Sequence, residues 1–157
     1  MEQRARRVFL PYEVQVALPP DHRLSRLKQI PLHALREEAF ITIKRSAAPA
    51  THELLLRLCR SAGFEPRVAK QSDRAQSILD LIAAGVGVAI LPVHFGRYPA
   101  NVVMRPLAPK PVSIPLCMVW RKDDASTLAH TLRTMILEYF QQQSSSKSGR
   151  SLFPVLL

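Results

Sequence analysis

Two short polar segments of the 157-residue chain carry residue types that suit the binding of an anion. Each segment follows an expected strand and extends into the start of an expected helix. The residues concerned are Lys44, Arg45, Ser46 and Thr51 in the first segment and Gln71, Ser72 and Ser77 in the second. Such side chains donate hydrogen bonds to a carboxylate, and the free N–H groups of a helix N-terminus attract one. The pattern predicts a site for a small organic acid.

The same residues also have a purely local role open to them. Thr51, and Ser72 or Asp73, can cap the helices that follow, because their side-chain oxygens accept hydrogen bonds from first-turn N–H groups. Arg45 can simply lie in solvent. The residue types and their spacing leave both roles open.

Motifs of catalysis and of metal binding do not occur in the sequence. There is no G-x-S-x-G, no H-E-x-x-H and no cysteine motif of a catalytic family, and Glu37-Glu38 is most simply an exposed turn beside a strand. The five histidines lack the short spacings of metal ligands, and Cys59 and Cys117 lie among apolar neighbours as free thiols do. We expect no enzyme activity, no cofactor and no metal.

A formal net charge of +10 favours contact with polyanions. The basic residues are spread over both ends and many loops, and aromatic residues that would stack on bases make up only 6% of the chain. A solvated basic surface and a basic nucleic-acid-binding protein both stay as interpretations of the charge. No apolar run approaches the roughly 20 residues of a membrane span, and no signal-peptide pattern follows the N-terminus, so we expect a cytoplasmic protein without membrane contact.

Short strands that alternate with helices are expected to position the two polar segments. Runs of β-branched and apolar residues between prolines and glycines predict strands at 13–18, 39–43, 67–70, 86–91, 102–107 and 113–120. Apolar residues at helical spacing predict helices at 51–62, 75–82 and 128–140, the last capped by Asp124 or Ser126. Pro31 can open a further helix of one or two turns at 32–37, because proline is tolerated at a first helical position. This order predicts an α/β domain with a largely parallel sheet.

Gly85 and Gly87 do not form a dinucleotide-binding motif. The glycines of that motif follow a strand and open a helix, whereas Gly85 closes a helix and leads into a strand. We therefore expect Gly85 to form a left-handed cap and Gly87 to allow neighbouring elements to approach closely. The strand after them is expected to be an interior parallel strand.

Several phrases in a fixed order carry a resemblance to a known family. The phrases are Leu79–Pro92 and, more weakly, Val16–Leu24, Glu38–Ile41, Cys59–Pro66, Arg105–Leu107 and Val119–Arg121. Together they resemble, over residues 14–140, the regulatory domain of LysR-type bacterial transcriptional regulators, although the family often has proline where Arg23 stands. The strongest phrase, Leu79–Pro92, resembles the family's helix, double-glycine turn and buried strand.

The resemblance implies a periplasmic-binding-protein-like (type II) fold, with one complete lobe at about 40–93 and part of the second. Residues 13–141 then form a partial effector-binding domain. Residues 1–12 are an N-terminal segment that need not be ordered, and residues 142–157, which are low in hydrophobicity, form a disordered tail.

The resemblance also implies a function in sensing rather than catalysis. A small anionic effector would bind in the two polar loops, and the signal would pass through contacts in a homo-oligomer or in a hetero-oligomer with an intact regulator. DNA would be bound only through a helix-turn-helix, which we expect to be absent from this chain. A decayed regulator remnant that only hetero-oligomerises remains an alternative.

Overall fold

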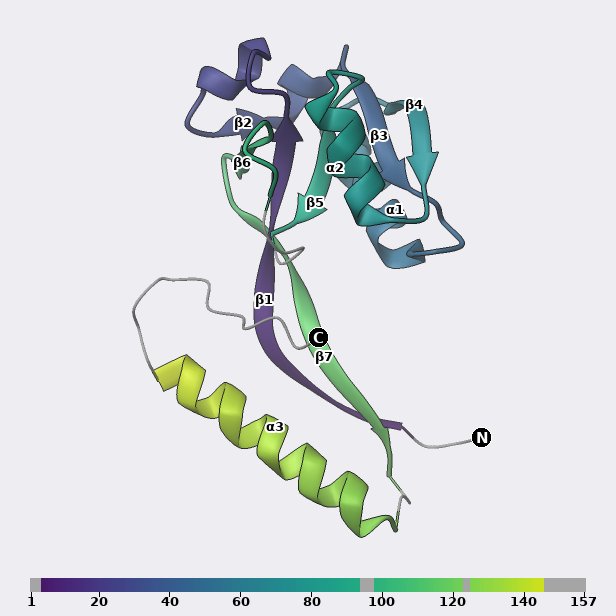
Figure 1. Cartoon of the computed structure of the whole chain (residues 1–157), viewed down its shortest axis with the longest axis vertical. Helices are drawn as coiled ribbons and strands as arrows, with labels where there is room; N and C mark the ends of the chain where they lie inside the picture. Colours follow the sequence, from purple (N-terminus) through teal and green to yellow (C-terminus); the bar gives the residue numbers. More distant parts are fainter. Residues whose placement is uncertain (1–3, 94–97, 123–124, 146–157) are drawn as a thin grey trace. The chain divides into compact units, whose positions relative to one another are not determined.

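The computed structural model describes residues 4–93, 98–122 and 125–145, which belong to two compact units. The larger unit is Tyr12–Ile114, and the smaller combines Met1–Pro11 with Pro115–Leu157. The elements in chain order (Figure 1) are β1 (Arg4–Leu18), η1 (Arg23–Arg26), β2 (Ile30–Pro31), η2 (Leu32–Leu35), β3 (Ala39–Ile43), α1 (Pro49–Ser61), β4 (Arg67–Ser72), α2 (Ala75–Ala83), β5 (Ala89–Pro92), β6 (Val103–Ala108), β7 (Val112–Arg121) and α3 (Thr127–Ser145).

Parallel and antiparallel pairings are mixed in the strands. One sheet has the order β2-β6-β1-β5, in which β1 runs antiparallel to both β5 and β6, and β7 also pairs with β1. The strands β3 and β4 form a separate parallel pair. The prediction of a largely parallel sheet is therefore wrong for the first sheet, because apolar patterning shows that a strand is buried and not which way its partner runs.

Alternating side chains divide the core into two apolar clusters. Phe40 and Val88 pack on one face with residues of α1, whereas Ile41 and Ala89 pack on the other face with residues of α2. Successive side chains of a strand point to opposite faces, so the two helices cover opposite sides of β3 and β5. Cover on both faces explains the nearly continuous apolar runs at these strands.

The backbone approaches itself very closely at Gly87. A Cβ atom at this position would lie 2.3 Å from the carbonyl oxygen of Ala39. The Val88 N–H donates to that same oxygen at 2.9 Å, and Ile41 N–H donates to the Val88 carbonyl at 2.8 Å. The expected close approach at Gly87 is confirmed, and it joins the segment before β5 to β3.

The end of α2 follows its prediction more closely than the strand after it. Gly85 has a φ of +75°, which confirms the left-handed cap. The strand β5, however, begins at Ala89 and pairs antiparallel with β1, so only Val88 makes a parallel bridge, to Phe40. All of β5 is buried, as expected, but it stands at the end of its sheet's strand order, and the parallel direction is wrong for β5 itself.

The two ends of the chain also differ from expectation. Residues 4–12, expected in an N-terminal segment that need not be ordered, belong to β1, which pairs with β7, although the sequence there holds three arginines and Pro11. At the other end α3 runs to Ser145, past the predicted start of the tail at 142, and residues 146–157 lie outside the described residues. The start of α3 agrees with one of its two predicted caps. The Ala129 N–H donates to Ser126 Oγ at 3.3 Å, which confirms Ser126 as the cap of α3. The alternative, Asp124, lies outside the described residues.

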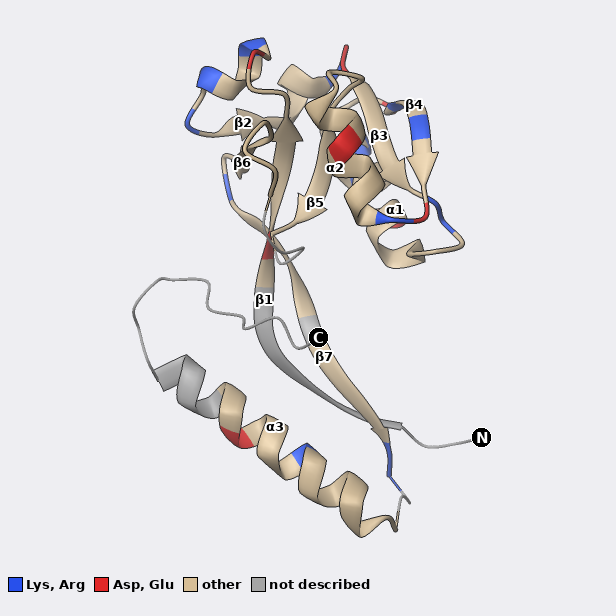
Figure 2. Cartoon of the chain, in the orientation of Figure 1, with Lys and Arg blue, Asp and Glu red and all other residues tan. Residues whose placement is uncertain are grey.

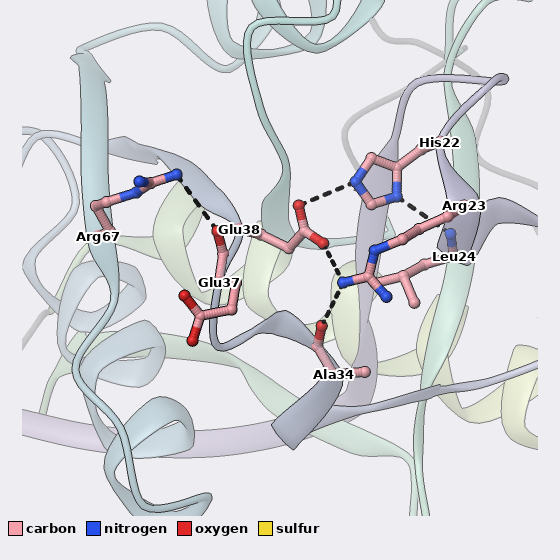
Figure 3. A network of polar contacts seen from close by, with 7 residues as sticks. All are labelled: His22, Arg23, Leu24, Ala34, Glu37, Glu38 and Arg67. Carbon is pink, nitrogen blue, oxygen red and sulfur yellow. Dashed lines mark hydrogen bonds and ion pairs between the residues drawn. The ribbon is translucent and has the colours of Figure 1, made fainter.

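Glu38, just before β3, binds the segment that follows β1 (Figure 3). Its Oε1 accepts from Arg23 Nη2 at 2.6 Å, and its Oε2 lies 3.1 Å from His22 Nε2. The Leu24 N–H donates to His22 Nδ1 at 3.2 Å, so the ring proton lies on Nε2 and is donated to Glu38. One half-buried carboxylate thus fixes both a histidine tautomer and an arginine.

We expect Glu38→Ala to lower the free energy of unfolding by about 1–2 kcal/mol, because donors on His22 and Arg23 lose a charged acceptor. The matched control is Glu65→Ala. Glu65 accepts from Arg60 at 2.7 Å with both side chains well exposed, and such pairs contribute about 0.5 kcal/mol or less. Urea unfolding of both variants checks the difference, and equal losses would contradict it.

We expect Gly87→Ala to lower the free energy of unfolding by about 3 kcal/mol, because the new methyl group meets a backbone carbonyl that cannot turn aside. Gly85→Ala serves as the control. At Gly85 a Cβ meets nothing within 4 Å, so only the left-handed backbone is penalised, by about 1–2 kcal/mol. Thermal unfolding that ranks Gly85→Ala as the more damaging change would show that the approach at Gly87 is looser than described.

Candidate functional site

A hollow of about 180 Å³ opens in the larger unit at the starts of α1 and α2. Its wall comes from β3, the loop after β3, both helices and β5. The lining residues are Ile43, Ala47, Ala48, Thr51, Asp73, Ala75, Ile78 and Leu91. Most of them are apolar, and Thr51 and Asp73 provide the polar side chains of the wall.

Both helices begin at this hollow without a side-chain cap. The N-cap residue is Ala48 for α1 and Arg74 for α2, and neither makes a side-chain hydrogen bond to its helix. First-turn N–H groups have no partner within the helix and carry partial positive charge. The hollow is therefore bordered by two helix ends that favour an anion.

The predicted helix caps are wrong. Proline is well suited to the first helical position, so α1 begins at Pro49 and Thr51 lies inside its first turn. Ser72 Oγ accepts from the Arg74 N–H at 3.1 Å, which forms a turn ahead of α2 rather than a cap, and Asp73 likewise precedes the N-cap residue.

Backbone hydrogen bonds hold the loop after β3 against its neighbours. The Lys44 N–H donates to the Ser72 carbonyl at 2.7 Å, and the Lys44 carbonyl accepts from Ala47 at 3.0 Å and from Ala48 at 3.1 Å. His52 Nδ1 lies 3.1 Å from the Ile43 carbonyl, which fixes the first turn of α1 to the end of β3. The two loops predicted to bear the site thus do lie together.

The predicted site residues have different positions around the hollow. Thr51 lines it, whereas Lys44, Ser46 and Gln71 have exposed side chains, and Ser72 and Ser77 are half-buried outside the lining. Arg45 is 73% exposed and forms an ion pair of 3.0 Å with Glu53. Of the residues predicted from their donor groups, the structure places only Thr51 in the wall.

Sequence reasoning missed most of the wall because it searched for donors. Ala47, Ala48 and Ala75 leave space through their small side chains, and a small apolar residue gives no chemical signal in a sequence. Asp73 gave a signal, but its position before a helix was interpreted as a cap. A charged residue between a strand and a helix could have been considered for the wall as well as for a cap.

A second hollow, of about 660 Å³, is more open and lies at the opposite end of α1. It is lined by Pro31, Leu32, His33, Ser61, Ala62, Ala108 and Pro109. Carbonyl groups at the end of a helix carry partial negative charge and disfavour anions. The smaller hollow is therefore the better candidate for an organic acid.

Two further searches of the described residues gave negative results. In residues 4–93, 98–122 and 125–145, no three or more His, Cys, Asp or Glu side chains form a group that could hold a metal ion. Within the same ranges no helix combines the length and the apolar character needed to cross a membrane.

Known proteins resemble the chain in sequence. The profile of the LysR substrate binding domain matches residues 2–141. The HTH-type transcriptional regulator TtuA of Agrobacterium vitis is 40% identical over 77 residues, which are 49% of this chain and 25% of TtuA. The regulator ShiR of Corynebacterium glutamicum (strain R) is 32% identical over 130 residues, 82% of this chain and 44% of ShiR. The chain thus spans less than half the length of these relatives.

Solved structures resemble it in fold. The BenM effector-binding domain with benzoate has a TM-score of 0.76 at 20% identity, over 97% of this chain and 70% of that chain. The QuiR effector-binding domain with shikimate has a TM-score of 0.73 at 16% identity, over 88% of this chain and 66% of that chain. These domains have the type II periplasmic-binding-protein-like α/β fold, and the relatives are transcriptional regulators rather than enzymes. The chain belongs to the LysR substrate-binding domain family of bacterial transcriptional regulators.

Proposed function

We propose that the hollow at the starts of α1 and α2 binds a small organic acid and that the chain is a cytoplasmic effector-sensing module. The observation that carries the proposal is that two uncapped helices begin at one mostly apolar hollow. First-turn N–H groups bind the carboxylate, and the wall of Ile43, Ile78 and Leu91 takes the hydrocarbon part.

The charges around the hollow support an anionic ligand that also has a donor group. Lys44 and Arg74 flank wall residues in the sequence and add positive charge, while Glu53 offsets Arg45. Asp73 in the wall opposes a second negative group and accepts hydrogen bonds. An acid that carries a hydroxyl or ammonium group therefore fits better than a bare carboxylate.

The fold neighbours support the same class of ligand. The BenM and QuiR domains were solved with benzoate and shikimate, both of which are carboxylates. In the proposal the bound acid undergoes no reaction, and it acts by favouring one arrangement of an oligomer over another. The oligomer is formed with further copies or with an intact regulator, whose helix-turn-helix contacts DNA. The Lys44, Arg45, Ser46, Gln71, Ser72 and Ser77 side chains remain predicted contacts that a bound ligand would have to reach.

We expect Ala75→Leu to abolish acid binding, because the larger side chain fills the hollow and leaves the helix N–H groups in place. Thermal unfolding is followed with benzoate and hydroxybenzoates, and with benzamide as an uncharged control. An acid at one hundred times its Kd stabilises the protein by about 2.7 kcal/mol.

The matched control is Ala69→Leu, an exposed position on β4 outside the hollow. It should keep the full shift in melting temperature. The proposal fails if no acid of a broad panel shifts the wild-type transition, or if Ala75→Leu responds as the wild type does.

We expect Asp73→Asn to tighten the binding of benzoate about 3- to 10-fold, because a like charge leaves the wall. An acid with a hydroxyl group should gain less, since it loses a charged acceptor. Asp80→Asn, at an exposed position of α2 outside the hollow, should change neither affinity. Calorimetric titration measures the Kd of each acid for the wild type and the two variants. An equal gain in affinity for both acids would argue against a contact with Asp73.

A further inference from the structure

Asp73 contributes a carboxylate to the hollow at the starts of α1 and α2, and the other described residues of the lining are uncharged. The Arg74 N–H donates to Ser72 Oγ at 3.1 Å, so the turn ahead of α2 is closed by a serine and not by Asp73. Among the residues that the structure describes, no hydrogen bond or ion pair involves the Asp73 side chain. Its oxygens are therefore available as acceptors for a ligand.

The basic residues near Asp73 in the sequence do not act as its counter-ion. Arg74 follows it directly, as the adjoining red and blue stretches between β4 and α2 show (Figure 2), but the Arg74 side chain is exposed and forms no ion pair with a described residue. Arg45 pairs with Glu53 at 3.0 Å. A carboxylate without a counter-ion attracts a cation, which the ligand itself can provide.

The Asp73 carboxylate and the helix N–H groups belong to one end of the hollow. Ala75, the first residue of α2, follows Asp73 by two positions, and both line the hollow. The Lys44 N–H donates to the Ser72 carbonyl at 2.7 Å, and the Lys44 carbonyl accepts at 3.1 Å from Ala48, the N-cap residue of α1. An acceptor for a cation and donors for an anion thus lie close together.

The rest of the wall suits a hydrocarbon group. Ile78 and Leu91 are buried and Ile43 is half-buried, and these three side chains come from α2, β5 and β3. A charged or strongly polar group placed against them would lose its hydration without gaining hydrogen bonds. The part of the ligand that meets them is therefore apolar.

An ammonium group satisfies Asp73 better than a hydroxyl group does. A hydroxyl group donates one neutral hydrogen bond, and the carboxylate of the ligand then remains a second negative charge beside Asp73. An ammonium group donates a charge-assisted hydrogen bond, which is roughly twice as strong, and it makes the ligand neutral overall. The positive ends of the helices attract the carboxylate and repel the ammonium group, so the ligand has one favoured orientation.

We propose that the ligand is an α-amino acid with an apolar side chain, whose ammonium group binds the Asp73 carboxylate. This inference rests on the proposed function, in which the first-turn N–H groups bind the carboxylate of the ligand. An α-amino acid carries both charged groups on one carbon atom, which matches the short separation between Asp73 and the start of α2. Asp73 then distinguishes amino acids from other acids of the same shape.

Calorimetric titration with four ligands of one skeleton tests the inference. They are leucine, 2-hydroxy-4-methylpentanoate, 4-methylpentanoate and 3-methylbutylamine, and matching sets built on valine and phenylalanine cover other shapes. In at least one set the wild type should bind the amino acid about 10-fold more tightly than the plain acid, with the hydroxy acid between them and the amine weakest.

Two variants locate the contact. In Asp73→Asn the amino acid should lose about 10-fold in affinity and the plain acid should gain, so that the preference is reversed. Asp80→Asn removes the same charge from an exposed position of α2 outside the hollow and should keep the wild-type order. Both side chains are exposed, so the melting temperatures without ligand should equal that of the wild type.

The failure of this inference can be distinguished from that of the proposed function. If the plain acid of every set binds at least as tightly as the amino acid, acid binding stands and the amino-acid class is wrong. A preference that survives in Asp73→Asn also overturns the inference, as does tighter binding of 4-aminobutyrate, whose charged groups lie far apart. If the amine binds as tightly as the amino acid, or if no ligand binds, the proposed function fails as well.

Discussion

The close approach of Gly87 to the Ala39 carbonyl determines how the larger unit is built. Two backbone hydrogen bonds at Val88 depend on it, and they place the segment before β5 beside β3. With these strands adjacent, their alternate side chains form two apolar faces, and α1 and α2 each cover one. Both helices then begin at the same hollow, so the geometry of the candidate site follows from one position without a side chain.

Some features of the fold could be predicted from the sequence because they depend on local chemistry. The left-handed turn at Gly85, the tight contact at Gly87 and the cap at Ser126 each depend on a few neighbouring residues, and each is confirmed. The direction of β5 was not predictable in this way. A buried strand has the same apolar pattern whether β1 beside it runs parallel or antiparallel, and only the path of the whole chain decides. The strand before Glu13 was missed because its arginines and Pro11 are unfavourable in isolation.

The candidate site shows the same division between local and distant causes. The two loops were found because each lies between a strand and a helix, and the fold brings the ends of such strands together. The wall was not found, because Ala48 and Ala75 matter for the space they leave and Leu91 enters from a strand distant in sequence. Sequence patterns indicate donors well and cavities poorly, since a cavity is a property of several segments at once.

The absence of side-chain caps on α1 and α2 has a consequence for how such a domain diverges. Peptide N–H groups belong to every residue type but proline, so most point substitutions leave them in place. A hollow that binds an anion through peptide N–H groups can still bind it after the alanines and the leucine of its wall are replaced by other residues. Evolution can then alter the shape of the accepted molecule step by step, without first losing the attraction that brings it in.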